Sequence, residues 1–550
     1  MLNISKKNLF YFCFLLIIIF AGVLRIRYLF DFTGLSYDEL YVWKIASNSN
    51  IIDLFKELIN TDYHPPLHFM FIHYWMNLFS SSDFSLRCSS LLFSFGIVIV
   101  FYFIGKEVKD KNIGIIFLLL ATFYPFSVYF SQNVRFYILA DLIIALIFLQ
   151  LYRLLKSEKI KDIVILILLN LLLLYTQTMG SIFVFGEFVS LLIYYYFKNK
   201  KLCKTILKAS ILNLLFYLPQ LYITIAQLIN SKHTLLDSPW EWSIWTKYAM
   251  LTGNLGLIFP FENKLILCVL LLFLIVFLFA NLIKSKDNHI NFSLLFFGIY
   301  VFLLALSSIF GLIHFNSNIL YFSTFNYFLL ILCALYVATI KTSKTKIKAC
   351  VLIVLSFLLN HNIYEKPGVD DFKYPIEFIN NSEYKKSTVF LIRGGQFINK
   401  YSNSIKTFDI EADRLFTMKL SQENISNVFD KNIINLSLDD RKKYLKDYLI
   451  SSVGTNNLKQ YFELNINNLE KNEYFIVIIE MHTHMPEIFD LSIKDKQTVI
   501  NNKWFPLPLM VSSKINYDVL NLANNHKQLK FIQKLTSNNK KWHLYIYQKI

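Results

Sequence analysis

Two adjacent carboxylates, Asp38 and Glu39, lie in the stretch GLSYDELYVW (34–43), directly after a long apolar run. A carboxylate fixed just outside a membrane can act as a general base toward a bound hydroxyl group. Ser36-x-x-Glu39 also fits a capping box, in which the glutamate bonds back to the serine N–H at a helix start. Asp38 would then stand in the first turn, where the helix dipole favours negative charge. The spacing alone leaves both carboxylates open between catalysis and helix initiation.

His64 and Arg135 could bind an anion. The residue before a proline is held extended, so His64, which precedes Pro65 and Pro66, is expected to project from a rigid corner. The prolines could equally just separate two elements. Arg135 stands at the head of an expected membrane span, and its guanidinium can bind a phosphate through two parallel hydrogen bonds. The competing explanation is a side chain that reaches lipid headgroups.

Other ionisable residues lie in or beside apolar segments, where such groups are usually functional. Asp141 follows Tyr137 by one helical turn and could brace the same site as Arg135. Glu187 is expected to pair structurally inside a helix bundle. Arg87, at the mouth of another span, is expected to reach lipid headgroups.

Metal and cofactor signals are weak. Glu480, His482 and His484 alternate along an expected strand and share one face, but short HxH patterns often arise without a metal. The six cysteines form no CxxC pair, which argues against a thiolate zinc site. The sequence contains neither a GxGxxG nor a Walker motif, which argues against a nucleotide-driven pump. The sequence assigns no metal site and no certain cofactor, and leaves a divalent cation open.

The elements that must position these residues belong to a membrane protein. The chain has 550 residues, of which 55% are hydrophobic, and a mean hydropathy of +0.44. Several apolar stretches are long enough to cross about 30 Å of hydrocarbon as helices. The net charge of +17 does not indicate a nucleic-acid partner, because much of the Lys and Arg lies in short loops that set topology. The predicted class is a polytopic α-helical membrane protein.

Basic loops recur between the apolar stretches. If all of them lie in the cytoplasm, each pair of neighbouring basic loops must be separated by an even number of membrane crossings. The result is about eleven spans and a C-terminus outside the cytoplasm. The expected spans lie near 9–30, 87–105, 113–129, 137–154, 163–179, 181–197, 205–223, 264–283, 291–310, 319–340 and 349–363. The segment 66–79 is too short to cross and is predicted to be a helix in the outer interface, within an outer loop of residues 31–86.

The character of the chain changes after residue 363. The remainder is polar and rich in Asn and Lys, and it lacks a spanning run. Strands are expected at 387–395, 474–484 and 542–550, and helices at 375–386 and 439–450. The sequence therefore predicts a transmembrane domain over 1–363 and a small extracytoplasmic α/β domain over 364–550.

A family resemblance rests on four stretches in order: SYDELYVWKIA, HPPLHFMFIHYW, DFSLRCSSLLFSFGIVIVFYFIGKEV and FYPFSVYFSQNVRFYILADLI. Together they resemble the GT-C glycosyltransferases, specifically the protein-mannosyltransferase and lipid A aminoarabinose-transferase group with its lipopolysaccharide-core branch. The resemblance covers about residues 10–200. It implies a multi-span bundle in the cell membrane that transfers a sugar from a polyprenyl-phosphate donor to a glycan, lipid or protein acceptor on the outer face.

The resemblance also implies roles for single residues. Asp38 falls on the family's catalytic acidic position, with Glu39 beside it, and His64 heads the H/K-P-P-L motif associated with the donor phosphate. Arg135 and Tyr137 match the Arg and Tyr of a YSQEARMY-like segment. Three departures stand out: Asn133 replaces an acidic residue, Gln177 stands where many relatives have His, and NILYFSTF (318–325) lacks an Arg.

The resulting hypothesis makes Asp38 the base for the acceptor hydroxyl and assigns His64 and Arg135 to the departing phosphate, with inversion at the sugar carbon. Glu39 would mainly hold the helix start. Other classes stay open. A polysaccharide polymerase or ligase should carry several Arg residues in a late outer loop, and 229–247 has none. A lipid-linked-sugar transporter should show paired, interrupted spans. A sensor whose outer domain is the active part needs no single loop carboxylate.

Overall fold

The computed structural model describes residues 6–27, 29, 34–62, 64–230, 264–309, 319–358, 373–385, 387–391, 395–402, 405–407, 462–463, 466–480, 519–536 and 542–550. These residues form two compact units. The first holds the described residues of 6–29, 41–230 and 264–358. The second holds 34–40 together with the described residues from 373 onward. A short piece of the first outer loop thus groups with the C-terminal residues.

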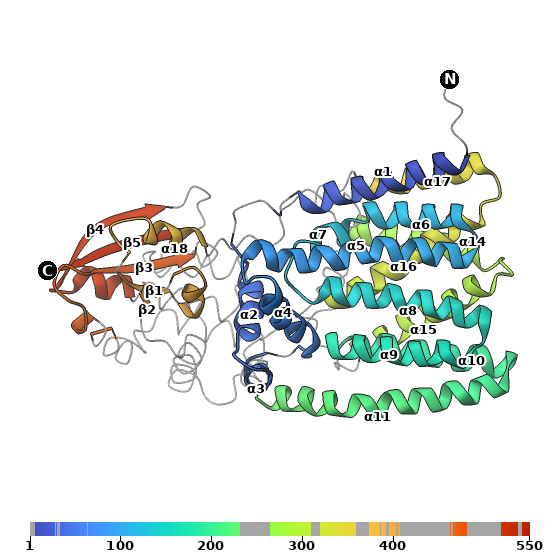
Figure 1. Ribbon diagram of the computed structural model, residues 1–550, viewed down its shortest axis with the longest axis horizontal. Coiled ribbons are helices and arrows are strands. Elements are labelled where there is room, and N and C mark those ends of the chain that lie inside the picture. The colour runs from blue at the N-terminus through green and yellow to red at the C-terminus, as the bar shows by residue number, and fades with distance from the viewer. Residues whose placement is uncertain are drawn as a thin grey trace, which may run out of the picture. The chain divides into compact units, whose positions relative to one another are not determined.

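The first unit is helical (Figure 1). Its long helices are α1 (Lys6–Ile26), α5 (Asp83–Val108), α6 (Lys111–Phe123), α8 (Tyr137–Ser157), α9 (Ile160–Thr176), α10 (Gly180–Lys198), α11 (Lys200–Asn230), α14 (Lys264–Leu282), α15 (Asn288–Ile309), α16 (Ile319–Thr339) and α17 (Ser343–Leu358). The shorter ones are α3 (Ile51–Thr61), α4 (Leu67–Leu78) and α7 (Pro125–Phe130), while α2 (Tyr37–Ala46) begins in the second unit.

Every expected span overlaps one of these helices. By length and composition, five of the described helices can cross a membrane: α5, α8, α10, α11 and α15. Shorter apolar segments lie in α1, α6, α14 and α16. The chain is therefore a membrane protein with several transmembrane helices, and the count of eleven crossings stays a prediction.

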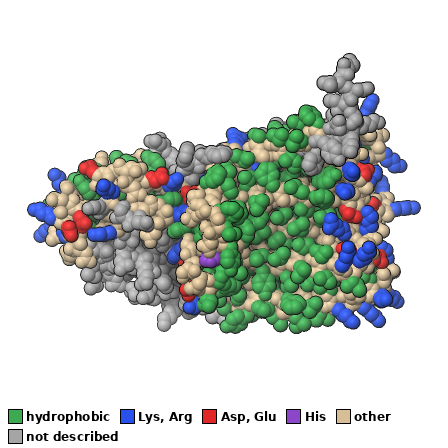
Figure 2. Space-filling view, viewed as in Figure 1, with side chains coloured by type: hydrophobic (Ala, Val, Ile, Leu, Met, Phe, Trp, Pro, Cys, Tyr) green, Lys and Arg blue, Asp and Glu red, His purple; other side chains and the backbone are tan. Residues whose placement is uncertain are grey.

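The basic loops meet at one end of the helical unit. Lys156 pairs with Glu107 at 3.1 Å, and Lys198 pairs with Glu158 at 3.0 Å, which joins three of the loops. Figure 2 shows Lys and Arg side chains gathered at this end of the bundle, beside a broad hydrophobic surface. This clustering agrees with the prediction that these loops lie on the same side of the membrane.

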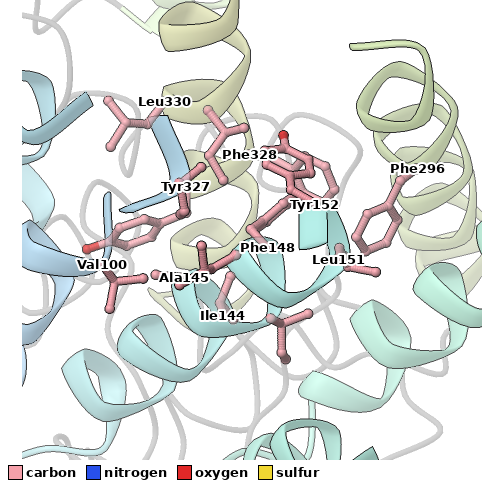
Figure 3. Packing of buried hydrophobic residues seen from close by; sticks show 14 of the residues in the cluster. Val100, Ile144, Ala145, Phe148, Leu151, Tyr152, Phe296, Tyr327, Phe328 and Leu330 are labelled. Atoms are coloured by element: carbon pink, nitrogen blue, oxygen red, sulfur yellow. The ribbon is translucent and has the colours of Figure 1, made fainter. Parts of the chain in front are cut away.

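Aromatic rings fill the centre of the bundle (Figure 3). The ring centroid of Phe148 in α8 lies 5.9 Å from that of Phe296 in α15 and 4.8 Å from that of Phe328 in α16. The hydroxyl groups of Tyr152 and Ser293 lie 2.7 Å apart and join α8 to α15. Dense contacts of this kind hold α8 firmly, and α8 begins two residues after Arg135.

A buried arginine donates hydrogen bonds to backbone carbonyls at the end of α6, just before α7 begins. Pro125 has no N–H, so the carbonyl of Ala121 loses the partner that a continuous helix would give it. Arg25 of α1 donates to this carbonyl at 3.2 Å and to the carbonyl of Thr122 at 2.9 Å. It also donates to the hydroxyl of Ser94 in α5 at 2.6 Å. Arg25 thereby joins α1 and α5 to the point where the chain turns toward Arg135.

Replacing Arg25 with alanine is expected to lower the thermal stability of the detergent-solubilised protein. The buried carbonyl of Thr122 would lose its bond from Arg25, which should cost about 1–3 kcal/mol, while the carbonyl of Ala121 would keep its 3.4 Å bond from the N–H of Tyr124. Pro125→Ala supplies an N–H for Ala121, so the double variant should regain part of the loss. Arg27→Ala, which removes an exposed arginine two residues away, is the matched control. Equal unfolding temperatures for Arg25→Ala and Arg27→Ala would contradict this role.

The second unit contains a five-stranded mixed sheet in the order β2-β1-β3-β5-β4. Strands β1 (Thr388–Leu391), β2 (Lys406–Thr407) and β3 (Tyr474–Glu480) run parallel, while β5 (Trp542–Lys549) is antiparallel to β3 and to β4 (Leu529–Thr536). The helix α18 (Lys373–Asn380) and the 3-10 helix η3 (Gly395–Lys400) accompany the sheet. Residues 475–478 of β3 are all buried, which explains the continuous apolar run of this strand.

The expected strands correspond to β1, β3 and β5, and the first expected helix corresponds to α18. The sequence reading missed β4, because this edge strand LKFIQKLT has mostly exposed side chains and an irregular register between Phe531 and Gln533. The expected helix at 439–450, and His482 and His484, lie outside the described residues.

Candidate active site

The two carboxylates of α2 have different environments. The backbone N–H of Ser36 donates to Oε2 of Glu39 at 2.8 Å, and the N–H of Leu40 donates to the Ser36 carbonyl at 2.9 Å. Glu39 is only 1% exposed, so its carboxylate serves the helix start, as the capping-box spacing predicts. Asp38, by contrast, is exposed.

His64 is held at its corner by Asp62. The backbone N–H of His64 donates to Oδ1 of Asp62 at 2.9 Å, which forms an Asx turn, and the same oxygen contacts Nδ1 of the imidazole. Pro65 and Pro66 are buried, and α4 begins at the next residue. The contact through Nδ1 orients the ring and leaves Nε2 as the nitrogen that can face a ligand.

Arg135 is placed by the turn between α7 and α8. The carbonyl of Asn133 accepts the hydroxyl hydrogen of Ser90 in α5 at 2.7 Å and the backbone N–H of Arg135 at 2.8 Å. Arg135 is 7% exposed. Burial within the protein argues against the alternative that this side chain reaches lipid headgroups.

Three basic side chains gather around the ring of Phe136. The imidazoles of His64 and His68 lie 4.5 and 6.4 Å from this ring between centroids. The guanidinium carbon of Arg135 lies 5.4 Å from the centroid of Phe136 and 5.7 Å from that of Tyr137. We call His64, His68, Arg135 and Phe136, together with Asp62, the Phe136 cluster.

The electrostatics of this cluster suit an anion. Burial alone would raise the pKa of Asp62, but the charges of His64 and Arg135 and the hydrogen bonds from His64 hold it at about 2. Burial lowers the pKa of His68 to about 3, and the charges of Arg135 and His64 add to the shift. Asp62 is therefore ionised and His68 neutral near pH 7. His64 and Arg135 both act on Asp62 as positive charges, and a phosphodiester would add a second negative charge to balance them.

His68 adds a hydrogen-bonding group without charge. It is 1% exposed, and neither ring nitrogen has a hydrogen-bond partner among the described residues. A buried polar group of this kind is costly unless something satisfies it. His73 of α4 is also buried, whereas Tyr74 and Leu78 of the same helix are exposed.

The local Asp-x-His arrangement is not itself evidence of a site. Asp287 and His289 make the same pair of contacts at the start of α15, with 2.8 Å from the backbone N–H and 3.1 Å from Nδ1 to Oδ1 of Asp287. There the arrangement caps a helix. What distinguishes Asp62 and His64 is their association with Arg135 and the Phe136 ring.

The other predicted residues have mixed positions. Tyr137 begins α8 and lies beside Arg135, with its ring 5.1 Å from that of Phe130. Asp141 is fully buried one turn further, within electrostatic range of the hydroxyl groups of Tyr124 and Tyr327. Asp141 therefore lies inside the bundle, one turn after Tyr137 in α8, and its bracing of the Arg135 site stays a prediction.

Two further predictions concerned structural charges. Oε1 of Glu187 accepts a hydrogen bond from the Asn170 amide at 3.1 Å, which agrees with a structural role inside the bundle. Arg87 is 6% exposed, so the prediction that it reaches lipid headgroups is wrong. Packing of neighbouring helices around the start of α5 encloses it.

Sequence reading missed Asp62, His68 and Gln227. The amide of Gln227 in α11 donates to the carbonyl of His64 at 3.0 Å and ties the corner to a distant helix. Asp62 has a local signal, because an aspartate two residues before a rigid corner favours an Asx turn. His68 lies one helical turn beyond His64. Nothing in the sequence indicates Gln227, because its contact depends on tertiary packing.

No metal site emerges within the described part of the chain, where no three His, Cys, Asp or Glu side chains converge. Glu480 ends β3, and its predicted partners lie outside the described residues. The divalent cation that the sequence leaves open stays a prediction.

Comparisons with known proteins find a family model that matches part of the chain and solved structures with a similar fold. A family model described as dolichyl-phosphate-mannose-protein mannosyltransferase matches residues 63–223, which contain His64, Arg135, Tyr137 and Asp141. A search of curated proteins found no match. Among solved structures, the chain is similar to ArnT from Cupriavidus metallidurans in the apo state, with a TM-score of 0.52, 10% identity and 97% of each chain covered.

The chain is also similar to the apo oligosaccharyltransferase of Archaeoglobus fulgidus, with a TM-score of 0.50 and 11% identity over 97% of this chain and 81% of that chain. ArnT from C. metallidurans bound to undecaprenyl phosphate gives a TM-score of 0.49 and 10% identity, with 97% of each chain covered. At these identities the likeness concerns the fold.

Proposed function

We propose that this chain, whose family-model match and fold support a GT-C superfamily glycosyltransferase, transfers a hexose or pentose from a polyprenyl-phosphate donor to a cell-envelope acceptor. The acceptor is a glycolipid, a polysaccharide or a protein. The proposed location is the cell membrane, with the reaction and the C-terminal domain on the extracytoplasmic side. The observation that carries the proposal is the Phe136 cluster.

The cluster suits the phosphate of a lipid donor. Arg135 supplies a planar fork for two phosphate oxygens, and His64, oriented by Asp62, offers Nε2 to a third. Both residues belong to an apolar helical unit, in which a polyprenyl chain would be soluble. The donor phosphodiester carries one negative charge, and the departing polyprenyl phosphate carries more, so these cations stabilise the leaving group most strongly as the bond breaks.

Asp38 completes the proposed reaction as the base. It accepts the proton of the acceptor hydroxyl while the hydroxyl oxygen forms a bond to the anomeric carbon of the sugar. The bond from that carbon to the phosphate oxygen breaks, and the electron pair leaves with polyprenyl phosphate. Attack opposite the phosphate inverts the anomeric centre. Glu39 keeps the start of α2 in place through Ser36.

The experiment that tests this function uses the purified full-length protein and synthetic short-chain polyprenyl-phosphate sugars. Binding of these donors, with competition by free polyprenyl phosphate, is expected first, because it needs no acceptor. A strain that lacks the gene should in parallel lose one sugar from an envelope glycan, lipid or protein, as measured by mass spectrometry. Absence of donor binding together with an unchanged glycan profile would refute the proposal.

A further inference from the structure

The segment that leads into α2 is held by the C-terminal unit. Residues 34–40 belong to the same compact unit as the described residues from 373 onward. The backbone N–H of Leu35 donates to the hydroxyl oxygen of Tyr401 at 2.9 Å, and Leu35 is fully buried. This contact joins residues 366 positions apart and lies three residues before Asp38.

Gly34 reinforces the contact by its lack of a side chain. A Cβ atom placed on Gly34 would lie 2.5 Å from the Cβ of Lys373, 3.0 Å from the hydroxyl oxygen of Tyr401 and 3.1 Å from the backbone nitrogen of Lys373. Carbon atoms do not approach one another so closely without displacement. The backbone before Asp38 therefore lies directly against the start of α18.

Hydrogen bonds connect Tyr401 to α18, the helix that begins at Lys373. Asn380, at the end of α18, donates from its amide to the carbonyl of Tyr401 at 3.0 Å and accepts the hydroxyl hydrogen of Ser402 at 2.7 Å. The N–H of Tyr401 donates to the carbonyl of Ile398 in η3 at 3.0 Å. Tyr401 and α18, which begins at Lys373, thus form one support rather than two independent contacts.

We propose that Tyr401 and Lys373 are positioning residues, through which the C-terminal domain sets the place of the Asp38 carboxylate. The inference rests on the proposed function, in which Asp38 is the base. Tyr401 and Lys373 contact Leu35 and Gly34, which lie three and four residues before Asp38. The hydrogen bond from the Ser36 N–H to Glu39 then fixes the direction in which α2 begins. Because a displacement of about 1 Å can slow an enzyme by about 100-fold, a distant hydroxyl can matter for rate.

The first test separates rate from donor binding. Tyr401→Phe keeps the ring but leaves the buried Leu35 N–H without its acceptor, and we expect kcat to fall about 10- to 100-fold while the donor KM stays within about twofold. Tyr547→Phe is the matched control, because it also removes a hydroxyl hydrogen bond of this domain, at 2.9 Å to Asn524. Equal kcat values for the two variants, in an assay where Asp38→Asn is inactive, would overturn the inference and leave the proposed function intact.

The second test asks whether a second substitution, Lys373→Gly, suppresses the effect of Gly34→Ala. Gly34→Ala should reduce kcat like Tyr401→Phe, because the new methyl group displaces the segment from α18. Lys373→Gly removes the nearest obstructing atom, so the double variant Gly34→Ala/Lys373→Gly should recover a large part of kcat. A purely destabilising effect predicts the opposite, since the second substitution puts glycine into the first turn of a helix. A double variant slower than Gly34→Ala would contradict the inference.

The third test does not need activity. Disulfides have Cβ atoms about 3.5–4.5 Å apart, so Gly34→Cys and Lys373→Cys should form a bond after a shift of about 1 Å. Linked peptides from the double variant, absent from each single variant, would show the contact directly. Failure to crosslink would overturn the inference, whereas crosslinking in a protein whose Asp38→Asn variant stays active would overturn only the assignment of the base.

Discussion

Asp38→Asn is expected to reduce glycosyl transfer by about two to four orders of magnitude, the usual scale for loss of a general base. The structure strengthens this expectation, because Asp38 is exposed at the first turn of α2 while its neighbour is buried and engaged in the cap. Asparagine has nearly the same shape and is accepted at helix starts, so folding should be preserved. Transfer from a synthetic polyprenyl-phosphate sugar is the measurement, with donor binding followed in parallel.

Glu39→Gln is the matched control for this result. Glutamine keeps an acceptor oxygen for the Ser36 N–H, so the capping bond can survive and the loss of rate should be much smaller. An active Asp38→Asn protein with an inactive Glu39→Gln protein would show that the roles are reversed. If both proteins keep full activity, the carboxylates serve only to start the helix.

Arg135→Ala is expected to lower kcat/KM for the donor by about 10- to 100-fold or more, since each charged hydrogen bond contributes about 1.5–3 kcal/mol and the leaving phosphate gains charge as the bond breaks. Use of the acceptor should change far less. Arg135→Lys should recover only part of the loss, because an ammonium group cannot bind two phosphate oxygens in the same fork. Steady-state kinetics with donor and acceptor varied separately measure both effects.

Arg153→Ala controls for the loss of one positive charge. Arg153 is exposed near the C-terminal end of α8, so its removal should leave kcat/KM for the donor unchanged. Thermal unfolding of Arg135→Ala shows whether its contacts with Phe136 and Tyr137 also matter for stability. Equal kcat/KM values for the donor in the wild type, Arg135→Ala and Arg135→Lys would remove Arg135 from the phosphate site.

The amino-acid sequence was sufficient to predict the features that depend on neighbours along the chain. Apolar runs of membrane-spanning length located the helices, because hydrocarbon demands satisfied backbone groups within each segment. The spacing of Ser36 and Glu39 predicted their hydrogen bond, which needs only one helical turn. The order of the acidic loop, the proline corner and the Arg-bearing turn indicated the GT-C resemblance that the family model and the fold support.

The tertiary structure decided which distant groups meet. The enclosure of Arg87, the bond from Arg25 to the carbonyl freed by Pro125 and the contact of Gln227 with His64 all depend on how helices pack. Burial lowers the pKa of His68, and the charge of Arg135 adds to this shift. Burial would raise the pKa of Asp62, but the charges of His64 and Arg135 and the hydrogen bonds from His64 lower it. Arg135 lies some seventy residues away from both in sequence. The hydrogen bond from the Leu35 N–H to the Tyr401 hydroxyl oxygen joins residues that are 366 positions apart, so it depends on the tertiary fold. Periodicity and local spacing carry no information about such long-range contacts. These contacts are fixed by packing and by the need to satisfy buried polar groups.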